Sequence, residues 1–174
     1  MPRPKARPVR ITGFPPIAHC SARVLVLGSM PSVASLAAGE YYAHPQNQFW
    51  RIVGELYGFD PAAPYRRRTQ ALRLAGIALW DVVASCARPG SLDADIDERS
   101  IIVNSFTGLL ATHPQIRRVC FNGRKAEAAW RRYVLRDLPQ TRELGYELLP
   151  SSSPAHAGMS YPRKLSAWRR ALTA

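Results

Sequence analysis

The sequence lacks the features that mark several large classes of protein. No apolar run among its 174 residues is long enough to span a bilayer. Its three cysteines, Cys20, Cys86 and Cys120, are too far apart for a disulfide framework or a zinc site, so we expect reduced thiols in a cytoplasmic protein. The basic, proline-rich N-terminus has no apolar stretch. We therefore expect a disordered arm over residues 1–12 rather than a secretory signal.

Motifs that bind common cofactors are absent as well. The sequence contains no GxGxxG after an apolar run and no GxxxxGK[ST]. It also contains no GxSxG and no HExxH. These absences argue against a dinucleotide-dependent enzyme, a P-loop ATPase, a serine hydrolase of the common α/β type and a zinc peptidase. We expect neither a metal nor an organic cofactor.

Acidic residues are scarce. Twelve acids stand against 24 basic residues, which gives a formal net charge of +12, and no acid precedes Glu40 or follows Glu147. A field of this sign favours binding to a polyanion through counterion release and electrostatic steering. The alternative is that an arginine-rich proteome raises the arginine content everywhere.

Short apolar runs alternate with helical patterns along most of the chain. The runs cover residues 23–27, 77–83, 118–121 and 146–149, and each predicts a buried parallel strand. Helical spacing predicts helices over residues 47–57, 65–75, 104–110 and 125–134 and after residue 160, with Asn104 as an N-cap, whereas residues 84–96 read as a loop. This alternation predicts one α/β domain over residues 13–174, a three-layer α/β/α sandwich with a four-stranded parallel sheet.

The stretch from Gly28 to Trp50 stands out because polar and aromatic residues gather directly after the first predicted strand. In an open α/β sheet, ligands bind beyond the carboxyl ends of the strands. We therefore expect a pocket there that stacks on, and hydrogen-bonds to, something flat. The plain alternative is an ordinary surface loop rich in proline and glycine.

Three separated segments share one resemblance. GSMPS after the first strand, YYAHPQNQFW, and LPSSSPAHAG after the last strand resemble the uracil-DNA glycosylase superfamily, most closely its hypoxanthine-DNA glycosylase branch. The similarity extends from about Gly13 to the C-terminal helix and includes GIALWDVV and VCFNGRKA. It implies hydrolysis, without a cofactor, of the N-glycosidic bond of a deaminated base flipped out of DNA, leaving an abasic site. The implied partner is DNA carrying deaminated bases, bound by a monomer with no membrane association.

By the same resemblance, the first two segments supply the catalytic and base-binding residues. Met30 stands where most branches carry Asn or Asp, so the role of holding water falls to Asn47. Its amide is no general base, but it can orient a water beneath the sugar; a plain helix N-cap is the alternative. Tyr42 is expected to stack on the base, although Tyr41 is not firmly separated from it. Ser29 and Met30 are also expected to contact the base.

Asp81 ends the second predicted strand, where uracil-reading relatives place a base-recognising Asn. A carboxylate there accepts the N1–H of hypoxanthine, whereas adenine has no such hydrogen and leaves the carboxylate unpaired. Uracil also has an imide N–H, so Asp81 alone does not separate uracil from hypoxanthine. The alternative role is to cap a local turn.

The last segment corresponds to the loop that enters the minor groove and fills the gap left by the flipped base. It comprises Ser151, Ser152, Ser153, Pro154, Ala155 and His156. Other branches have a His at the position of Ser151, so the group that stabilises the leaving base is open. No lysine lies in the three motifs, which favours a monofunctional enzyme without a lyase step. The rival interpretations are a uracil- or xanthine-directed glycosylase and a non-catalytic protein that binds damaged DNA.

Overall fold

The structure is a computed structural model that describes residues 9–139 and 143–173. Its strands are β1 (Arg10–Thr12), β2 (Val24–Gly28), β3 (Ile77–Asp81), β4 (Val83–Ala87), β5 (Asp97–Val103), β6 (Arg118–Asn122) and β7 (Gly145–Leu149). Its helices are α1 (Val33–Ala38), α2 (Phe49–Tyr57), α3 (Tyr65–Leu74), α4 (Phe106–Thr112), α5 (Arg124–Tyr133) and α6 (Tyr161–Thr173), with short 3₁₀ turns over Asp93–Asp95 and Leu135–Asp137.

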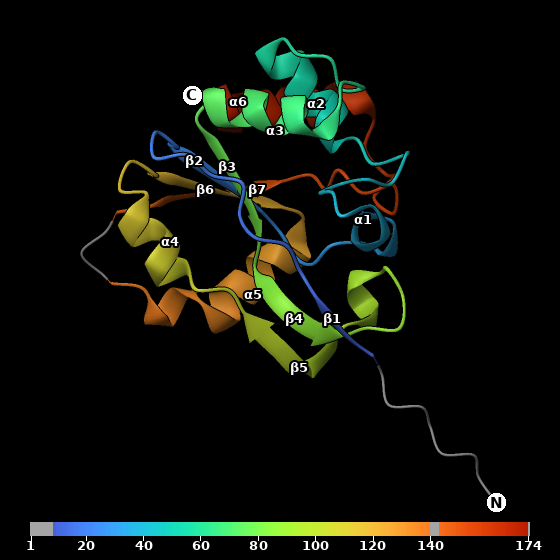
Figure 1. The fold of residues 1–174 in the computed structure, drawn as a ribbon, viewed down its shortest axis with the longest axis vertical. Coiled ribbons are helices and arrows are strands. Elements are labelled where there is room, and N and C mark those ends of the chain that lie inside the picture. Colours follow the sequence, from blue (N-terminus) through green and yellow to red (C-terminus); the bar gives the residue numbers. More distant parts are fainter. Residues whose placement is uncertain (1–8, 140–142, 174) are drawn as a thin grey trace, which may run out of the picture.

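A four-stranded parallel sheet in the order β3-β2-β6-β7 lies at the centre of the molecule. Helices α2, α3 and α6 cover one face of this sheet, and α4 and α5 cover the other (Figure 1). The predicted three-layer α/β/α architecture is therefore confirmed, including all four strands of the parallel sheet.

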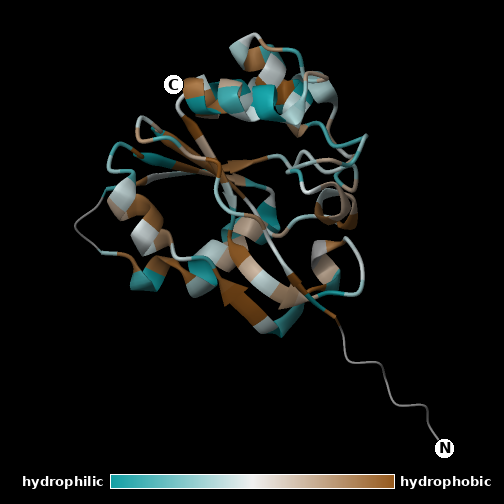
Figure 2. Ribbon diagram, in the orientation of Figure 1, coloured by the Kyte–Doolittle hydropathy of each residue, from teal (hydrophilic) through white to brown (hydrophobic). Residues whose placement is uncertain are grey.

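The central strands form where the sequence has continuous apolar runs, because both of their faces are covered by helices. Every residue of β2 and β3 is buried. On one side, Phe49 of α2 packs edge-on against Trp168 of α6, and on the other, Phe106 of α4 packs edge-on against Trp130 of α5. Figure 2 shows the hydrophobic residues in the strands and the hydrophilic residues on the outer side of helices such as α3.

A second, three-stranded antiparallel sheet in the order β1-β4-β5 was not predicted. The expected loop over residues 84–96 instead contains most of β4 and a 3₁₀ turn. β4 is short and partly polar, and its pairing with β5 shifts register twice, so it has no regular alternation to read from the sequence. The second hydrophobic cluster (Met30, Val83, Cys86 and Ile96) ties this sheet to the loop after β2.

Two further expectations at element ends were wrong. The end of the expected disordered arm, Arg10–Thr12, is strand β1, because Ile11 pairs with the distant Cys86 and packs on the second hydrophobic cluster. Residues 1–8 of that arm lie outside the described residues. Asn104 is not the N-cap of α4, since its side-chain amide donates to the Asp81 carbonyl at 2.8 Å; the helix begins after Ser105.

Candidate functional site

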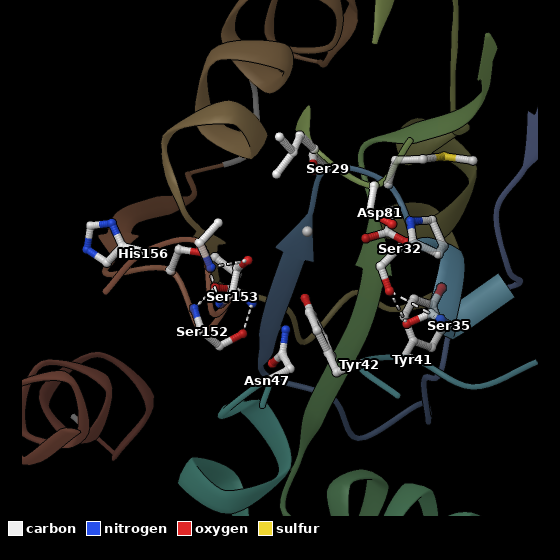
Figure 3. A pocket seen from close by; sticks show the side chains of 18 of the residues that line it. Ser29, Ser32, Ser35, Tyr41, Tyr42, Asn47, Asp81, Ser152, Ser153 and His156 are labelled. Carbon is white, nitrogen blue, oxygen red and sulfur yellow. Dashed lines mark hydrogen bonds between the residues drawn. The ribbon is translucent and has the colours of Figure 1, made fainter. Parts of the chain in front are cut away.

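A pocket of about 340 Å³ opens beyond the carboxyl ends of β2, β3 and β6. Its size falls within the range of small-molecule sites in proteins. All the predicted site residues except Pro154 line it: Ser29, Met30, Tyr42, Asn47, Asp81, Ser151, Ser152, Ser153, Ala155 and His156. The predicted location, at the switch from strand ends to loops, is therefore where the structure has its pocket (Figure 3).

Asp81 provides a buried carboxylate at this pocket. It lies directly opposite Gly28 in the β2–β3 register and is only 4% exposed. The Asn104 side chain holds the Asp81 carbonyl, and the Gly28 carbonyl accepts a hydrogen bond from the amide of Val82 at 2.9 Å. These backbone contacts fix the strand end from which the carboxylate projects toward the pocket.

The two neighbouring tyrosines have different environments. Tyr41 is 2% exposed, and its hydroxyl donates to the carbonyl of Pro15 at 3.0 Å. The indole of Trp50 donates to the Tyr41 carbonyl at 2.7 Å. Burial, and then the charge of Asp81, raise the pKa of Tyr41 well above its ordinary value. Tyr41 is thus a neutral, fixed part of the pocket wall, packed into the main hydrophobic core.

Tyr42 is less buried and has an unusual backbone conformation. Its φ of 54° makes it the one non-glycine residue with positive φ among residues 9–139 and 143–173. Such a conformation costs of the order of 1 kcal/mol or more and persists where surrounding contacts enforce it. Here the ring stacks on Phe49 with centroids 4.2 Å apart, which places Tyr42 between the core and the pocket.

Asn47 lies at the start of α2, and its side-chain oxygen accepts a hydrogen bond from the amide of Phe49 at 3.0 Å. The backbone N–H of Asn47 donates to the His44 carbonyl at 2.9 Å. The N-cap of α2 is Gln48, so the alternative of a plain N-cap at Asn47 was wrong; the Asn47 side chain instead satisfies the first amide of the helix while it also lines the pocket. Figure 3 shows Asn47 beside Tyr42, below the end of β2.

Ser152 connects the last loop to the end of β6 and to the start of α2. Its amide donates to Asn122 Oδ1 at 2.8 Å, and Asn122 Nδ2 donates to its hydroxyl oxygen at 2.8 Å. Its carbonyl accepts from the amide of Gln48, next to Asn47, at 3.0 Å. Ser152 is fully buried, so these hydrogen bonds are shielded from water. Asn122, which lines the pocket, was within a quoted segment but was not predicted as a site residue.

His156 is exposed at the other end of this loop. Its amide donates to the Ser153 carbonyl at 3.0 Å, and its carbonyl accepts from the ammonium of Lys164 at 2.8 Å. Lys164 is 2% exposed as a residue, and burial lowers its pKa. The backbone of the loop is therefore held from beneath by α6, while the imidazole stays accessible.

The loop after β2 supplies Ser29 and Met30. The Ser29 carbonyl accepts a hydrogen bond from the amide of Val83 at 3.0 Å. Met30 is 7% exposed and belongs to the second hydrophobic cluster, so its side chain anchors this loop to the small sheet as well as lining the pocket. A thioether therefore serves packing at a position where an amide or carboxylate would be poorly matched to its neighbours.

One wall of the pocket was missed altogether. Ser91, Leu92 and Ala94, from the segment between β4 and β5, line it. This segment was read as part of the loop over residues 84–96, and nothing in its residues indicates that it meets the loop after β2. Only a tertiary contact brings this segment to the pocket: Ser91 Oγ accepts a hydrogen bond from the amide of Val33, at the start of α1, at 2.9 Å.

Neither a metal centre nor a membrane span is visible in the part of the chain that the structure describes. Over residues 9–139 and 143–173, no three His, Cys, Asp or Glu side chains cluster as metal ligands would. Within the same residues, every helix is too short or too polar to cross a bilayer.

Comparisons with known proteins agree with the fold. Hypoxanthine DNA glycosylases from Methanosarcina acetivorans and Methanosarcina barkeri are 39% and 37% identical to this chain, over 90% and 91% of it and 94% and 96% of their own lengths. A solution NMR structure of a candidate uracil DNA glycosylase from Methanosarcina acetivorans superposes with a TM-score of 0.78 at 34% identity, covering 94% of this chain and 97% of that one. The model of the uracil DNA glycosylase superfamily matches residues 15–173, and the chain belongs to this superfamily.

Proposed function

We propose that this protein is a DNA glycosylase that hydrolyses the N-glycosidic bond of deaminated bases in DNA, chiefly hypoxanthine, and leaves an abasic site. Membership of the superfamily and the two relatives named as hypoxanthine DNA glycosylases support the reaction class. The observation that carries the choice of base is the buried carboxylate of Asp81 in the pocket.

The carboxylate selects by hydrogen-bond complementarity. Hypoxanthine presents an N1–H that an ionised Asp81 accepts, whereas adenine presents a lone pair at the same position. Because Asp81 is 4% exposed, adenine would place its lone pair against a buried, charged carboxylate. Such a penalty is larger than the gain from one neutral hydrogen bond, and it supplies discrimination against normal adenine. Tyr42 stacks on the flipped base from the core side.

Asn47 holds the attacking water in this proposal. Its Oδ1 already accepts the amide of Phe49 and has a second lone pair, while its Nδ2 has two hydrogens to donate. The water oxygen bonds to C1′ as the bond from C1′ to N9 breaks, the electron pair of that bond leaves with the base, and the proton of water passes to the base by way of solvent. The amide positions the water and removes no proton itself.

The stabilisation of the leaving base rests on electrostatics rather than on a histidine. Ser151 stands at the position where other branches have His, and it lies against Gly123, where a β-carbon would be 3.2 Å from Ser151 Cβ. The start of α5 and the last loop thus approach each other closely at the pocket. We propose that oriented hydrogen-bond donors there, the hydroxyl of Ser151 among them, receive the developing charge.

One assay tests the proposed function. Duplexes with a single inosine, uracil, xanthine or adenine are incubated with the protein under single-turnover conditions, and abasic sites are cleaved with alkali. We expect release in the order inosine over uracil, with no release of adenine. Faster release of uracil would instead make this a uracil-directed enzyme. Binding to lesion duplexes with no release of any base would identify a non-catalytic reader of damage.

In this proposal the partner is duplex DNA, bound by a monomer at the nucleoid in the cytoplasm of a bacterial-type cell. The net charge of +12 supports the choice of a polyanion. Sedimentation of the free protein and of its complex with one lesion duplex tests the stoichiometry, and a dimer in either state would contradict it.

A further inference from the structure

The pocket mouth carries an exposed apolar side chain that the reaction described above does not use. Leu92 lines the pocket and is 56% exposed. Of the eight large hydrophobic residues exposed in the described part of the chain, it is the one that lines this pocket. A leucine that both lines a pocket and faces solvent lies at its rim. With the exposed Ala94 close by in the chain, Leu92 gives the pocket mouth an apolar edge, and apolar surface exposed at a pocket mouth indicates contact with a partner.

The segment that carries Leu92 is held against the loop after β2 and the start of α1. The Ser91 hydroxyl oxygen accepts the amide of Val33 at 2.9 Å. The guanidinium of Arg88, which is 4% exposed, donates to the carbonyl of Pro31. These two contacts fix both the residue before Leu92 and the strand end that leads to it. Leu92 therefore projects from a positioned support.

The loop from the other side of the pocket offers little apolar surface for the same purpose. Its tip consists of Ser153, Pro154 and Ala155, with His156 as the only large side chain. Enzymes that flip a base must unstack it, and apolar wedges that enter the base stack offset part of the cost of unstacking. The small tip of this loop leaves that contribution to another segment.

On the basis of the proposed glycosylase function, we infer that Leu92 is a second DNA-contacting wedge, which packs on the bases beside the flipped nucleotide from the side opposite His156. The exposed Asp95 lies three residues further along, where a carboxylate disfavours close approach of phosphates. The contact therefore involves base faces rather than the sugar-phosphate backbone. In this arrangement the flipped base enters the pocket between Leu92 and the last loop.

The test compares Leu92→Ala with Ile102→Ala. Ile102 is a matched control because it is an equally exposed aliphatic residue, 55% against 56%, on strand β5 that follows the Leu92 segment, and it does not line the pocket. Single-turnover release of hypoxanthine is measured on a well-paired duplex and on the same strand alone. We expect Leu92→Ala to slow release from the duplex at least about tenfold and to affect the single strand much less, because only the duplex requires unstacking and unpairing. Ile102→Ala should stay within about twofold on both.

Two further measurements make the outcome decisive. Leu92→Met, which keeps an apolar side chain of similar size, should restore most of the duplex rate. A fluorescent base analogue placed next to the inosine should show less unstacking with Leu92→Ala than with the wild type. Equal slowing on duplex and single strand would overturn the inference and make Leu92 a lid on the base, and unchanged rates on both would also overturn it. A wild type that releases nothing from either substrate would instead refute the proposed function.

Discussion

The side chains of Asp81 and Tyr42 both approach the space that a side chain at Gly28 would fill. A β-carbon at Gly28 would overlap the Oδ1 atom of Asp81 and lie 2.9 Å from the Tyr42 hydroxyl oxygen. The absence of a side chain at the end of β2 thus lets the carboxylate and the phenol reach the pocket together. This is one of the close approaches that only glycine permits.

Gly28→Ala should therefore damage the site while preserving the fold. Both colliding atoms lie at the ends of side chains, which rotate away more easily than backbone shifts. We expect hypoxanthine release to fall at least about tenfold while the thermal midpoint changes little, since a misplacement of about 1 Å near reacting groups is costly. Single-turnover assays and thermal unfolding measure the two effects.

Gly145→Ala is the matched control for this substitution. Its β-carbon would lie 3.7 Å from the Arg117 carbonyl oxygen, an ordinary contact, on strand β7 away from the pocket. Its activity and stability should both stay close to those of the wild type. Full activity in Gly28→Ala would show that neither the position of the carboxylate nor that of the phenol matters for release.

His156→Ala should slow release from a well-paired duplex much more than from single-stranded DNA. Its imidazole is proposed to fill the vacated stack or to contact the opposite strand, a need that arises only in a duplex. The substitution keeps the two backbone hydrogen bonds of His156, to Ser153 and from Lys164, so the loop itself should hold its shape. Equal slowing on both substrates would place His156 in the chemistry, and no slowing on either would leave it without a role.

The sequence predicted those parts of the fold that depend on local pattern. The residues of β2 and β3 form continuous apolar runs because they are buried on both faces. Such a run can be recognised in the sequence without knowing which strands lie beside it. β5 shows a different case. It is mostly exposed and begins with three charged residues, so only its pairing with β4 makes it a strand.

The residues of the site likewise fall into those that could be predicted and those that could not. Asp81 was predicted from the resemblance, which places a base-reading residue at the end of the second strand; its pairing opposite Gly28 brings it to the shared carboxyl edge of the sheet. The separation of Tyr41 from Tyr42 was left open, since it depends on which ring reaches the core. Leu92 and Asn122 were missed because their roles come from contacts between segments far apart in the chain.

Binding to DNA should weaken steeply as salt concentration rises. With 24 basic residues against 12 acids, complex formation should release several condensed counterions. The slope of log affinity against log salt, measured on an uncleavable lesion duplex, gives their number. A flat dependence would mean that the arginines reflect composition alone, and Leu92→Ala should leave the slope unchanged because its contact is apolar.

The buried thiol of Cys120 should make the fold sensitive to alkali. Burial raises the pKa of Cys120 from 9.0 to about 12, with a smaller opposing effect from Arg118. The folded state thus holds this proton more tightly than the unfolded chain, so the free energy of unfolding should fall as the pH rises from 9.0 toward 12. Denaturant titrations across this range measure the loss.

Thiol labelling tests the burial of Cys120 at neutral pH. Cys20 is exposed, whereas Cys86 and Cys120 are buried. A thiol reagent should therefore label one cysteine quickly in the native protein, and Cys20→Ser should remove that reaction. Fast labelling of Cys20→Ser would show that the core opens around a buried thiol.

Asn47 offers the sharpest test of the mechanism, because its side chain has two separable tasks. Its Oδ1 accepts the amide of Phe49 at the start of α2, and its amide group is proposed to hold the attacking water. Asn47→Ala removes both functions. We expect it to lower base release by at least about 100-fold while lesion-DNA binding stays nearly intact, and to cost about 1 kcal/mol of stability through the lost hydrogen bond to the Phe49 amide. Asn47→Asp keeps the acceptor for Phe49, so it should recover the stability. If Asn47→Ala instead keeps near-normal turnover, the water is held elsewhere and Asp81 becomes the first residue to test. If it unfolds while Asn47→Asp is stable and active, the main role of this position is the hydrogen bond to the Phe49 amide.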